Sequence, residues 1–216
     1  MTVMRATGAF RLDDVIARIR AAESDVGVRR SGQHTRGDHD LNPGLPGLWA
    51  EKPLTAAAVL VPIVAHPDQL TVLLTRRSAH LHDHAGQISF PGGRVDPCDE
   101  NPVACALREA EEEVRLPREL TEVIGRLDTY QTRTGFEIVP VVGIVKPPFD
   151  LKPDPFEVAE IFEVPLDFIV DPANHRRDSR VFQGAERHFW AMPFGTYYIW
   201  GATAGMLVNL SEVLRR

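Results

Sequence analysis

The sequence predicts an α/β fold in which strands and helices pack in layers. The first observation behind this prediction is that short apolar runs bounded by turn residues alternate with a few helical patterns along the chain. The second is the composition, because 44% of the 216 residues are apolar and 25% are charged. A chain of this length and composition can bury a substantial core, so we expect an ordered globular protein.

The chain divides into an N-terminal arm and one large domain. We expect an amphipathic helix over residues 10–22, followed by a polar loop rich in glycine, proline and arginine over residues 23–52. Two aspartates within the helix disfavour a targeting peptide. A helix that packs on the domain is therefore preferred to a targeting or partner helix. We predict an arm over residues 1–50 and a folded domain over residues 51–216.

Within the domain, six segments have the pattern of strands. They are residues 57–64, 70–74, 123–130, 137–145, 160–164 and 181–190. The turn signal His66-Pro67-Asp68 separates the first two, and Thr134-Gly135 separates the third from the fourth. A glycine-rich loop is expected over residues 85–93, and a final helix over residues 202–214 buries leucine side chains on one face.

A further helix follows the glycine-rich loop. Asn101 suits the N-cap position and Pro102 the first helical position, while Pro117 ends the helix. The helical repeat predicts an apolar stripe made of Val103, Leu107, Ala110 and Val114.

The same helix carries a group of carboxylates. Glu109, Glu112 and Glu113 are spaced i, i+3 and i+4 and share one face, whereas Glu111 falls outside the group and is expected to be a solvated charge. Arg108 lies beside Glu112 and can pair with it. Each pair of glutamates at helical spacing costs roughly 3 kcal/mol at an effective dielectric near 20. The face is therefore either an acidic surface in water or a site for a hard cation such as Mg²⁺ or Mn²⁺.

The loop and the helix together resemble the Nudix box. The matching residues are Phe90-Pro91-Gly92-Gly93, then Asp99, then Arg108-Glu109-Ala110-Glu111-Glu112-Glu113. Three departures are visible. The spacer between Gly93 and Arg108 is one residue longer than the commonest form, Asp99 stands where glutamate is usual, and Arg115 stands where glycine is usual.

This resemblance implies a Nudix-type α/β/α sandwich, with a mixed β-sheet between helices, and an enzyme that hydrolyses a diphosphate with the help of Mg²⁺ or Mn²⁺. The implied metal site consists of Glu109, Glu112, Glu113 and the backbone of Gly93. The implied catalytic groups are Arg108, Glu112 and Glu113.

The general base is left open. Glu112 is one candidate, and Glu157 and Glu160 in the acidic segment 154–160 are two others. That segment could equally be a solvated strand edge.

Upstream residues resemble the coenzyme A pyrophosphatase branch, which also has the longer spacer. The upstream residues are Leu73-Leu74-Thr75-Arg76-Arg77-Ser78, Gly86 and Phe90-Pro91-Gly92-Gly93. A downstream segment near residue 200, Ile199-Trp200-Gly201-Ala202-Thr203-Ala204, also resembles this branch. The branch implies cleavage of coenzyme A or acyl-CoA to adenosine 3′,5′-bisphosphate and a 4′-phosphopantetheine product. His82 stands where the branch has arginine, which keeps open another nucleoside diphosphate derivative such as ADP-ribose. A non-catalytic nucleotide-sensing module is disfavoured because the helix glutamates are present.

Several residues are candidates for substrate contact. They are Arg77, His82, Gln87, Phe90 and Arg94. The two arginines are the candidates for binding phosphate.

The remaining features concern partners and location. The net charge is −6, which disfavours a general nucleic-acid surface. Cys98 and Cys105 are expected to be reduced thiols, and no apolar run approaches the roughly 20 residues that a membrane span needs. We therefore expect a cytoplasmic protein that binds a small nucleotide substrate, with neither nucleic acid nor membrane as a partner. A homodimer is compatible with the sequence.

Overall fold

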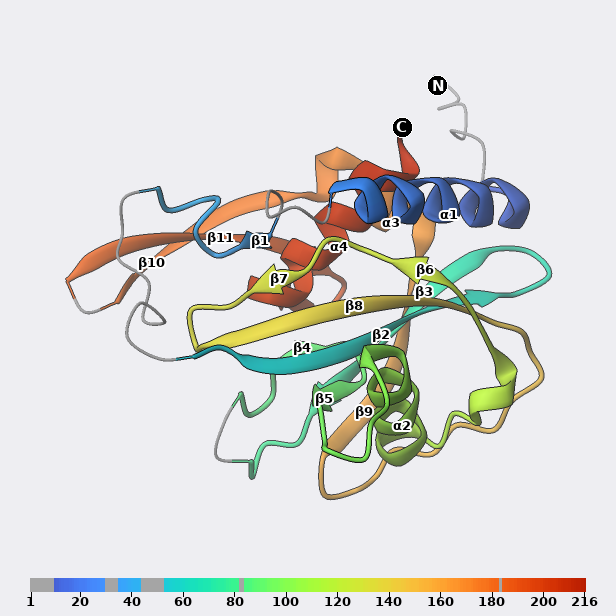
Figure 1. Ribbon diagram of the computed structural model, residues 1–216. Coiled ribbons are helices and arrows are strands. Elements are labelled where there is room, and N and C mark those ends of the chain that lie inside the picture. The colour runs from blue at the N-terminus through green and yellow to red at the C-terminus, as the bar shows by residue number, and fades with distance from the viewer. Residues whose placement is uncertain (1–9, 30–34, 44–52, 82–83, 183) are drawn as a thin grey trace, which may run out of the picture.

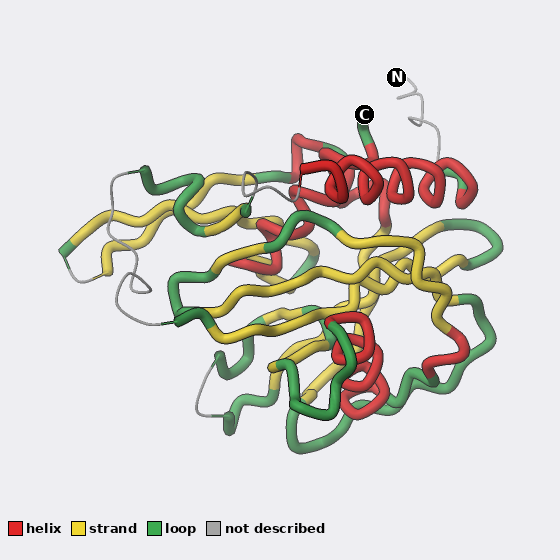
Figure 2. The backbone as a smooth tube through the Cα atoms, in the orientation of Figure 1, coloured by secondary structure: helices red, strands yellow, loops and turns green. Residues whose placement is uncertain are grey.

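The computed structural model describes residues 10–29, 35–43, 53–81, 84–182 and 184–216. In these residues, a large mixed sheet lies between helices on its two faces, and a smaller sheet extends from one side (Figure 1). The predicted α/β/α arrangement with a mixed sheet is confirmed. The distribution of helix, strand and loop along the chain is shown in Figure 2.

The large sheet has nine strands within the described residues. They are β1 (Arg36–Gly37), β2 (Thr55–Ala65), β3 (Leu70–Arg77), β4 (Ile88–Ser89), β5 (Gly92–Arg94), β6 (Thr121–Arg126), β7 (Tyr130–Gln131), β8 (Phe136–Val145) and β9 (Val158–Pro165). β2 lies at the centre, parallel to β8 and antiparallel to β3 and β5. β6 and β7 both pair antiparallel with β8, and β9 pairs antiparallel with β3. The predicted strand over residues 123–130 is therefore two strands, separated by a short break.

The small sheet corrects one sequence prediction. It contains β10 (Arg176–Phe182), β11 (Ala185–Phe194) and β12 (Tyr197–Trp200), all antiparallel. A single strand over residues 181–190 was predicted, but the chain turns back within that range. Gly184 has φ of 77°, a conformation that glycine adopts without steric cost, and this allows the turn.

The helices are divided between the two faces of the large sheet. They are α1 (Leu12–Arg29), α2 (Pro102–Val114), α3 (Leu166–Val170) and α4 (Gly201–Leu214), with short 3₁₀ turns at Arg118–Leu120 and Pro172–Asn174. Within the described residues, α2 is the helix that covers one face, whereas α1, α3 and α4 lie on the other (Figure 1). α2 and α4 agree with the sequence prediction. α1 continues through Arg29, into a stretch that was predicted to be a loop. No proline interrupts that stretch, and its one glycine, Gly27, costs a helix only about 1 kcal/mol.

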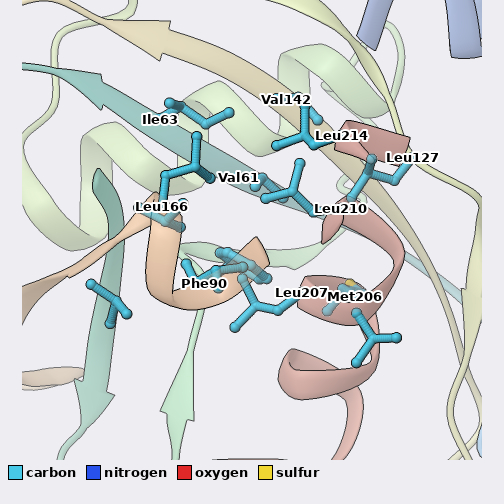
Figure 3. Packing of buried hydrophobic residues seen from close by; sticks show 14 of the residues in the cluster. Val61, Ile63, Phe90, Leu127, Val142, Leu166, Met206, Leu207, Leu210 and Leu214 are labelled. Atoms are coloured by element: carbon cyan, nitrogen blue, oxygen red, sulfur yellow. The ribbon is translucent and has the colours of Figure 1, made fainter. Parts of the chain in front are cut away.

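Alternation along β2 produces two hydrophobic layers. Val59, Val61 and Ile63 face α1 and α4, whereas Ala58 and Leu60 face α2. In the first layer, Phe90, Leu166 and Leu207 pack together (Figure 3). A fully buried side chain of this size contributes roughly 1.5–3 kcal/mol.

α1 is anchored to the first of these layers. Val15 and Ile19 are fully buried there, and the Arg18 guanidinium donates to the carbonyl of Leu214 at the end of α4. The helix is thus held by both apolar and polar contacts, as the preferred prediction of a packing helix requires.

No helix in the described part of the chain is both long and apolar enough to cross a membrane.

Candidate active site

α2 begins and ends as its local sequence predicts. The side chain of Asn101 accepts hydrogen bonds from the backbone N–H groups of Val103 and Ala104, at 2.9 and 3.0 Å, and Pro102 opens the helix. The helix ends at Arg115, which adopts the left-handed conformation with φ of 55° and ψ of 36°. That conformation explains why the Nudix box usually carries glycine at this position, since a side chain is strained there.

The buried face of α2 is rotated from the predicted stripe. Cys105, Ala106, Ala110 and Val114 are buried against the sheet, whereas Val103 and Leu107 are only half-buried. The rotation places Glu113 on the buried side, where it is 4% exposed.

The other helix glutamates are more accessible than Glu113. Glu109 is half-buried and Glu112 is exposed. Glu111 points to solvent and pairs with Arg118 at 2.8 Å, as expected of a solvated charge.

A pocket of about 250 Å³ brings these carboxylates together with a distant segment. Its lining comprises Glu109, Glu112, Glu113, Asp154, Phe156 and Glu157. Backbone hydrogen bonds fix the second segment, because Asp154 N–H donates to the carbonyl of Glu113 at 2.8 Å and Ser78 N–H donates to the carbonyl of Glu157 at 2.9 Å. The segment is thereby attached to the end of α2 on one side and to the end of β3 on the other.

Arg108 connects the helix to the preceding loop. Its guanidinium donates to both carboxylate oxygens of Asp99 at 2.9 Å and also reaches Glu109 and Glu112, each at 3.0 Å. These charge-assisted bonds hold the pKa of the Asp99 carboxyl well below its usual range. Aspartate is therefore long enough to accept this arginine at the position where glutamate is usual. The contacts favour a positioning role for Arg108.

Glu113 is a buried acid with little compensation from positive charge. Its nearest cation is Arg77, whose Nη1 lies 4.0 Å from the Glu113 Oε1 atom. The pKa of Glu113 is raised to about 8, chiefly by burial; Arg77 opposes the rise, and the neighbouring Glu157 and Glu109 add to it. Burial raises the pKa of Glu109 as well. The pocket disfavours its own negative charge in the absence of added cations.

Arg77 carries an unsatisfied donor beside this acid. Its Nε atom is buried and has no hydrogen-bond partner within the described residues. A buried guanidinium N–H normally has an acceptor, so this group is an exception among the described residues.

Gly93 is required by the position of Glu109. A Cβ atom built on Gly93 would lie 2.5 Å from Oε1 of Glu109, far closer than a van der Waals contact. The absence of a side chain thus allows the Glu109 carboxylate to lie against the backbone of β5.

Other predicted site residues lie away from the pocket. Glu160 pairs with Arg76 at 2.8 Å and accepts from the Tyr197 hydroxyl at 2.6 Å. Phe90 is 2% exposed and packs in the core.

Two further substrate-contact candidates also lie outside the pocket lining. Arg94 follows Gly93 on β5, so its side chain points to the opposite face of the sheet, and there it lies over the ring of Phe136. Gln87 contacts the ring of His84 at 3.0 Å. The candidate His82 falls outside the described residues.

Sequence reasoning missed two of the residues that line the pocket, Asp154 and Phe156. The sequence does identify the acidic segment 154–160 that contains them as a possible source of the general base. Its attachment to α2 depends on backbone pairing between residues far apart in the chain, and that pairing leaves no local pattern.

The pocket suits a divalent cation in the kind of donor it offers. Among the residues that the structure describes, five carboxylates line it and none of the lining residues is basic. These are the oxygen ligands that Mg²⁺ and Mn²⁺ prefer, and a cation would offset the charge that burial disfavours. Among the described residues, no three His, Cys, Asp or Glu side chains already converge closely enough to hold a metal. Two of the helix glutamates point toward Arg108 instead.

Comparison with known proteins gives consistent matches. The NUDIX domain family profile matches residues 54–183. The Escherichia coli protein named uncharacterized Nudix hydrolase NudL is 43% identical over 155 residues, which cover 72% of this chain and 80% of that protein.

Solved structures give further matches. The Nudix hydrolase RenU from M. smegmatis is 22% identical with a TM-score of 0.49, and the match covers 76% of this chain and 88% of that one. A MutT/nudix family protein from Enterococcus faecalis is 18% identical with a TM-score of 0.49, and that match covers 97% of this chain and 76% of the other.

Proposed function

We propose that the substrate of this chain, which belongs to the Nudix family and is a pyrophosphohydrolase acting on a nucleoside diphosphate derivative, is coenzyme A or an acyl-CoA. Hydrolysis of the diphosphate would release adenosine 3′,5′-bisphosphate and a 4′-phosphopantetheine product. The observation that carries this proposal is the position of the upstream signature. Arg77 and Ser78, which end the first run of this signature, border the carboxylate pocket, Arg77 beside Glu113 and Ser78 through its hydrogen bond to Glu157.

Nudix enzymes generally use divalent metal ions, and we propose Mg²⁺ or Mn²⁺ held by Glu109, Glu112 and Glu113, with the backbone of Gly93 alongside. Such an ion withdraws charge from phosphoryl oxygens and favours ionisation of a bound water. The buried position of Glu113 supports this assignment, since a buried carboxylate gains most from a cation.

Two arginines have separate roles in this scheme. The partly exposed guanidinium of Arg77 donates to a phosphate oxygen of the substrate, which orients the diphosphate beside the carboxylates. Arg108 holds Glu109, Glu112 and the loop residue Asp99 in one arrangement, through contacts of 2.9–3.0 Å.

Glu157 is the preferred general base among the three candidates. It lines the pocket opposite α2 and has no hydrogen bond or ion pair through its side chain within the described residues. Glu112 is paired with Arg108, and Glu160 is engaged by Arg76 and Tyr197. A free carboxylate facing the metal-ligating helix is placed to accept a proton from an attacking water.

His82 supports a second candidate substrate. Arginine at this position in the branch signature would provide a permanent cation for the 3′-phosphate of coenzyme A, and histidine does so only when protonated. Substrates without that phosphate, such as ADP-ribose, remain competitive for this reason.

The test is hydrolysis of a substrate panel with identification of the products. Coenzyme A, acetyl-CoA, 3′-dephospho-CoA, ADP-ribose, a nucleotide sugar and a nucleoside triphosphate would be compared with Mg²⁺ and with Mn²⁺, by chromatography and mass spectrometry. We expect the highest kcat/KM for a coenzyme A substrate, with adenosine 3′,5′-bisphosphate as product. A higher kcat/KM for ADP-ribose would overturn the coenzyme A assignment, and binding without hydrolysis of any substrate would indicate a nucleotide-sensing module.

The same panel tests the general base. Glu157→Gln should lower kcat by on the order of a hundredfold. Glu111→Gln is the matched control, because Glu111 is an exposed glutamate paired with Arg118 outside the pocket.

A further inference from the structure

We propose that Phe156 is the stacking surface for the nucleobase of the substrate and that His80 positions its ring. This inference rests on the proposed function, because it assigns the base-binding part of the same site. It commits the substrate to a nucleotide whose base lies beside the diphosphate, at the mouth of the carboxylate pocket.

Phe156 is exposed and does not contribute to the hydrophobic core. Its side chain is 67% exposed, and it belongs to neither of the two hydrophobic layers. The other exposed large apolar side chains within the described residues, Val181, Phe182 and Tyr198, all lie in the small sheet. A lone exposed phenylalanine is common, but this one also lines the pocket with the carboxylates.

The backbone around Phe156 is fixed from several directions. The Asp154 carboxylate accepts hydrogen bonds from the N–H groups of Phe156 at 2.8 Å and of Glu157 at 3.2 Å. The same short turn is attached to α2 through Asp154 and to the end of β3 through Glu157. Phe156 therefore projects from a constrained turn, and ordering it on ligand binding costs little backbone entropy.

A second aromatic ring contacts Phe156 from the neighbouring loop. His80 packs against it edge-on, with ring centroids 5.1 Å apart and an interplanar angle of 61°. This T-shaped geometry is favourable for aromatic pairs, and Phe156 remains largely exposed beside His80, so its ring surface is accessible to a planar ligand.

The chemistry of the pocket favours a nucleobase as the group that stacks on the Phe156 ring. In the proposed function the charged diphosphate lies at the carboxylate pocket, so a subsite beside it would accept an uncharged part of the substrate. Bases stack on phenylalanine rings regardless of their hydrogen-bonding pattern, because every base presents a π face. A flat apolar ring beside a diphosphate site thus matches a nucleoside, whereas a bare sugar phosphate gains nothing from it.

The experiment compares two inhibitors that differ only in the base. Inhibition constants for adenosine 5′-monophosphate and ribose 5-phosphate would be measured in wild type, Phe156→Ala, Phe156→Trp and the control Phe182→Ala. We expect Phe156→Ala to raise the inhibition constant of adenosine 5′-monophosphate at least about fivefold, the lower end of base–aromatic stacking. The ratio of the two inhibition constants should be unchanged in Phe182→Ala, whose ring is exposed on β10.

His80 is tested as a positioning residue by rescue. His80→Ala should weaken the preference for adenosine 5′-monophosphate over ribose 5-phosphate by less than Phe156→Ala does. His80→Phe, which keeps an aromatic edge, should restore the preference. An unchanged preference in both His80→Ala and Phe156→Ala would overturn the proposal.

A readout without catalysis separates this inference from the proposed function. In Phe156→Trp, adenosine 5′-monophosphate should quench a fluorescence component that is absent from wild type, and ribose 5-phosphate should not. Quenching in an enzyme that hydrolyses nothing would refute the proposed function and leave the base subsite standing. Hydrolysis without quenching, and with an unchanged inhibition constant in Phe156→Ala, would do the opposite.

Discussion

Replacing Glu113 with glutamine should stabilise the metal-free protein while disabling the enzyme. Burial raises the pKa of this carboxyl from the ordinary 4.5 to about 8, so the folded state disfavours its ionised form. At pH 7 the shift corresponds to a destabilisation on the order of 3 kcal/mol, because each pKa unit is worth about 1.4 kcal/mol. Glutamine is neutral and can still accept the hydrogen bond that the Gly92 backbone provides, so it avoids this cost.

The sign of the effect depends on pH. For an acid whose folded pKa is raised, the cost is absent below the unfolded pKa near 4.5 and grows as the pH rises toward 8. In a chelator, the free energy of unfolding of Glu113→Gln should exceed that of wild type at pH 8 and equal it near pH 4. Saturating Mg²⁺ should narrow the difference at pH 8, because a ligand at a hundred times its Kd stabilises wild type by about 2.7 kcal/mol and the variant by less.

Denaturant unfolding at both pH values, with and without Mg²⁺, measures the stability effect, and kcat measures the loss of activity. We expect kcat to fall by on the order of a hundredfold. Glu111→Gln is the control, because its exposed ion pair with Arg118 contributes at most about 1 kcal/mol. A less stable Glu113→Gln protein at pH 8 in chelator, or full activity at saturating Mg²⁺, would refute the reasoning.

Three further predictions follow from the arrangement around the pocket. Gly93→Ala should fold normally but lower kcat by on the order of tenfold to a hundredfold, because the new Cβ would lie 2.5 Å from Oε1 of Glu109 and would displace that carboxylate. A thermal melt and kcat together test this prediction, and an unchanged kcat would contradict it. Arg115→Gly should raise the free energy of unfolding by about 0.5–1 kcal/mol, because glycine relieves a left-handed residue at the end of α2; a destabilised variant would show that the arginine side chain contributes more than the strain. Deleting residues 1–50 should lower the melting temperature, because it exposes the apolar surface that α1 covers. Diphosphatase activity should remain measurable, because α1 lies on the face of the sheet opposite α2. A truncated protein that folds but has no activity would place the arm in the site.

Much of the site could be predicted from the sequence because its main element is local. The limits of α2 depend on Asn101, Pro102 and Pro117, and its carboxylates are placed by the helical repeat. The Nudix resemblance added Gly93 as a predicted metal ligand, and the structure shows that a side chain at this position would clash with Glu109.

Other predictions failed or fell short where longer-range contacts decide. The strand predicted over residues 181–190 spans a hairpin, because the apolar pattern continued across a turn. Phe90 belongs to the motif that precedes the helix, yet its ring is buried in the core. Strand alternation sends Arg94 to the face opposite the pocket, although it directly follows Gly93.

The sequence by itself determined the α/β class, the helix and its carboxylates, because caps and periodicity act over a few residues. Only the tertiary structure decided which carboxylates form the pocket. Glu113 is buried because the sheet covers its side of α2, and Glu157 joins it because the backbone of its turn pairs with Ser78 and Glu113. Glu160, three residues further along the same segment, is instead held by Arg76. The physical reason is that burial and backbone pairing are set by surfaces that meet only when distant segments pack together, and no local pattern encodes them.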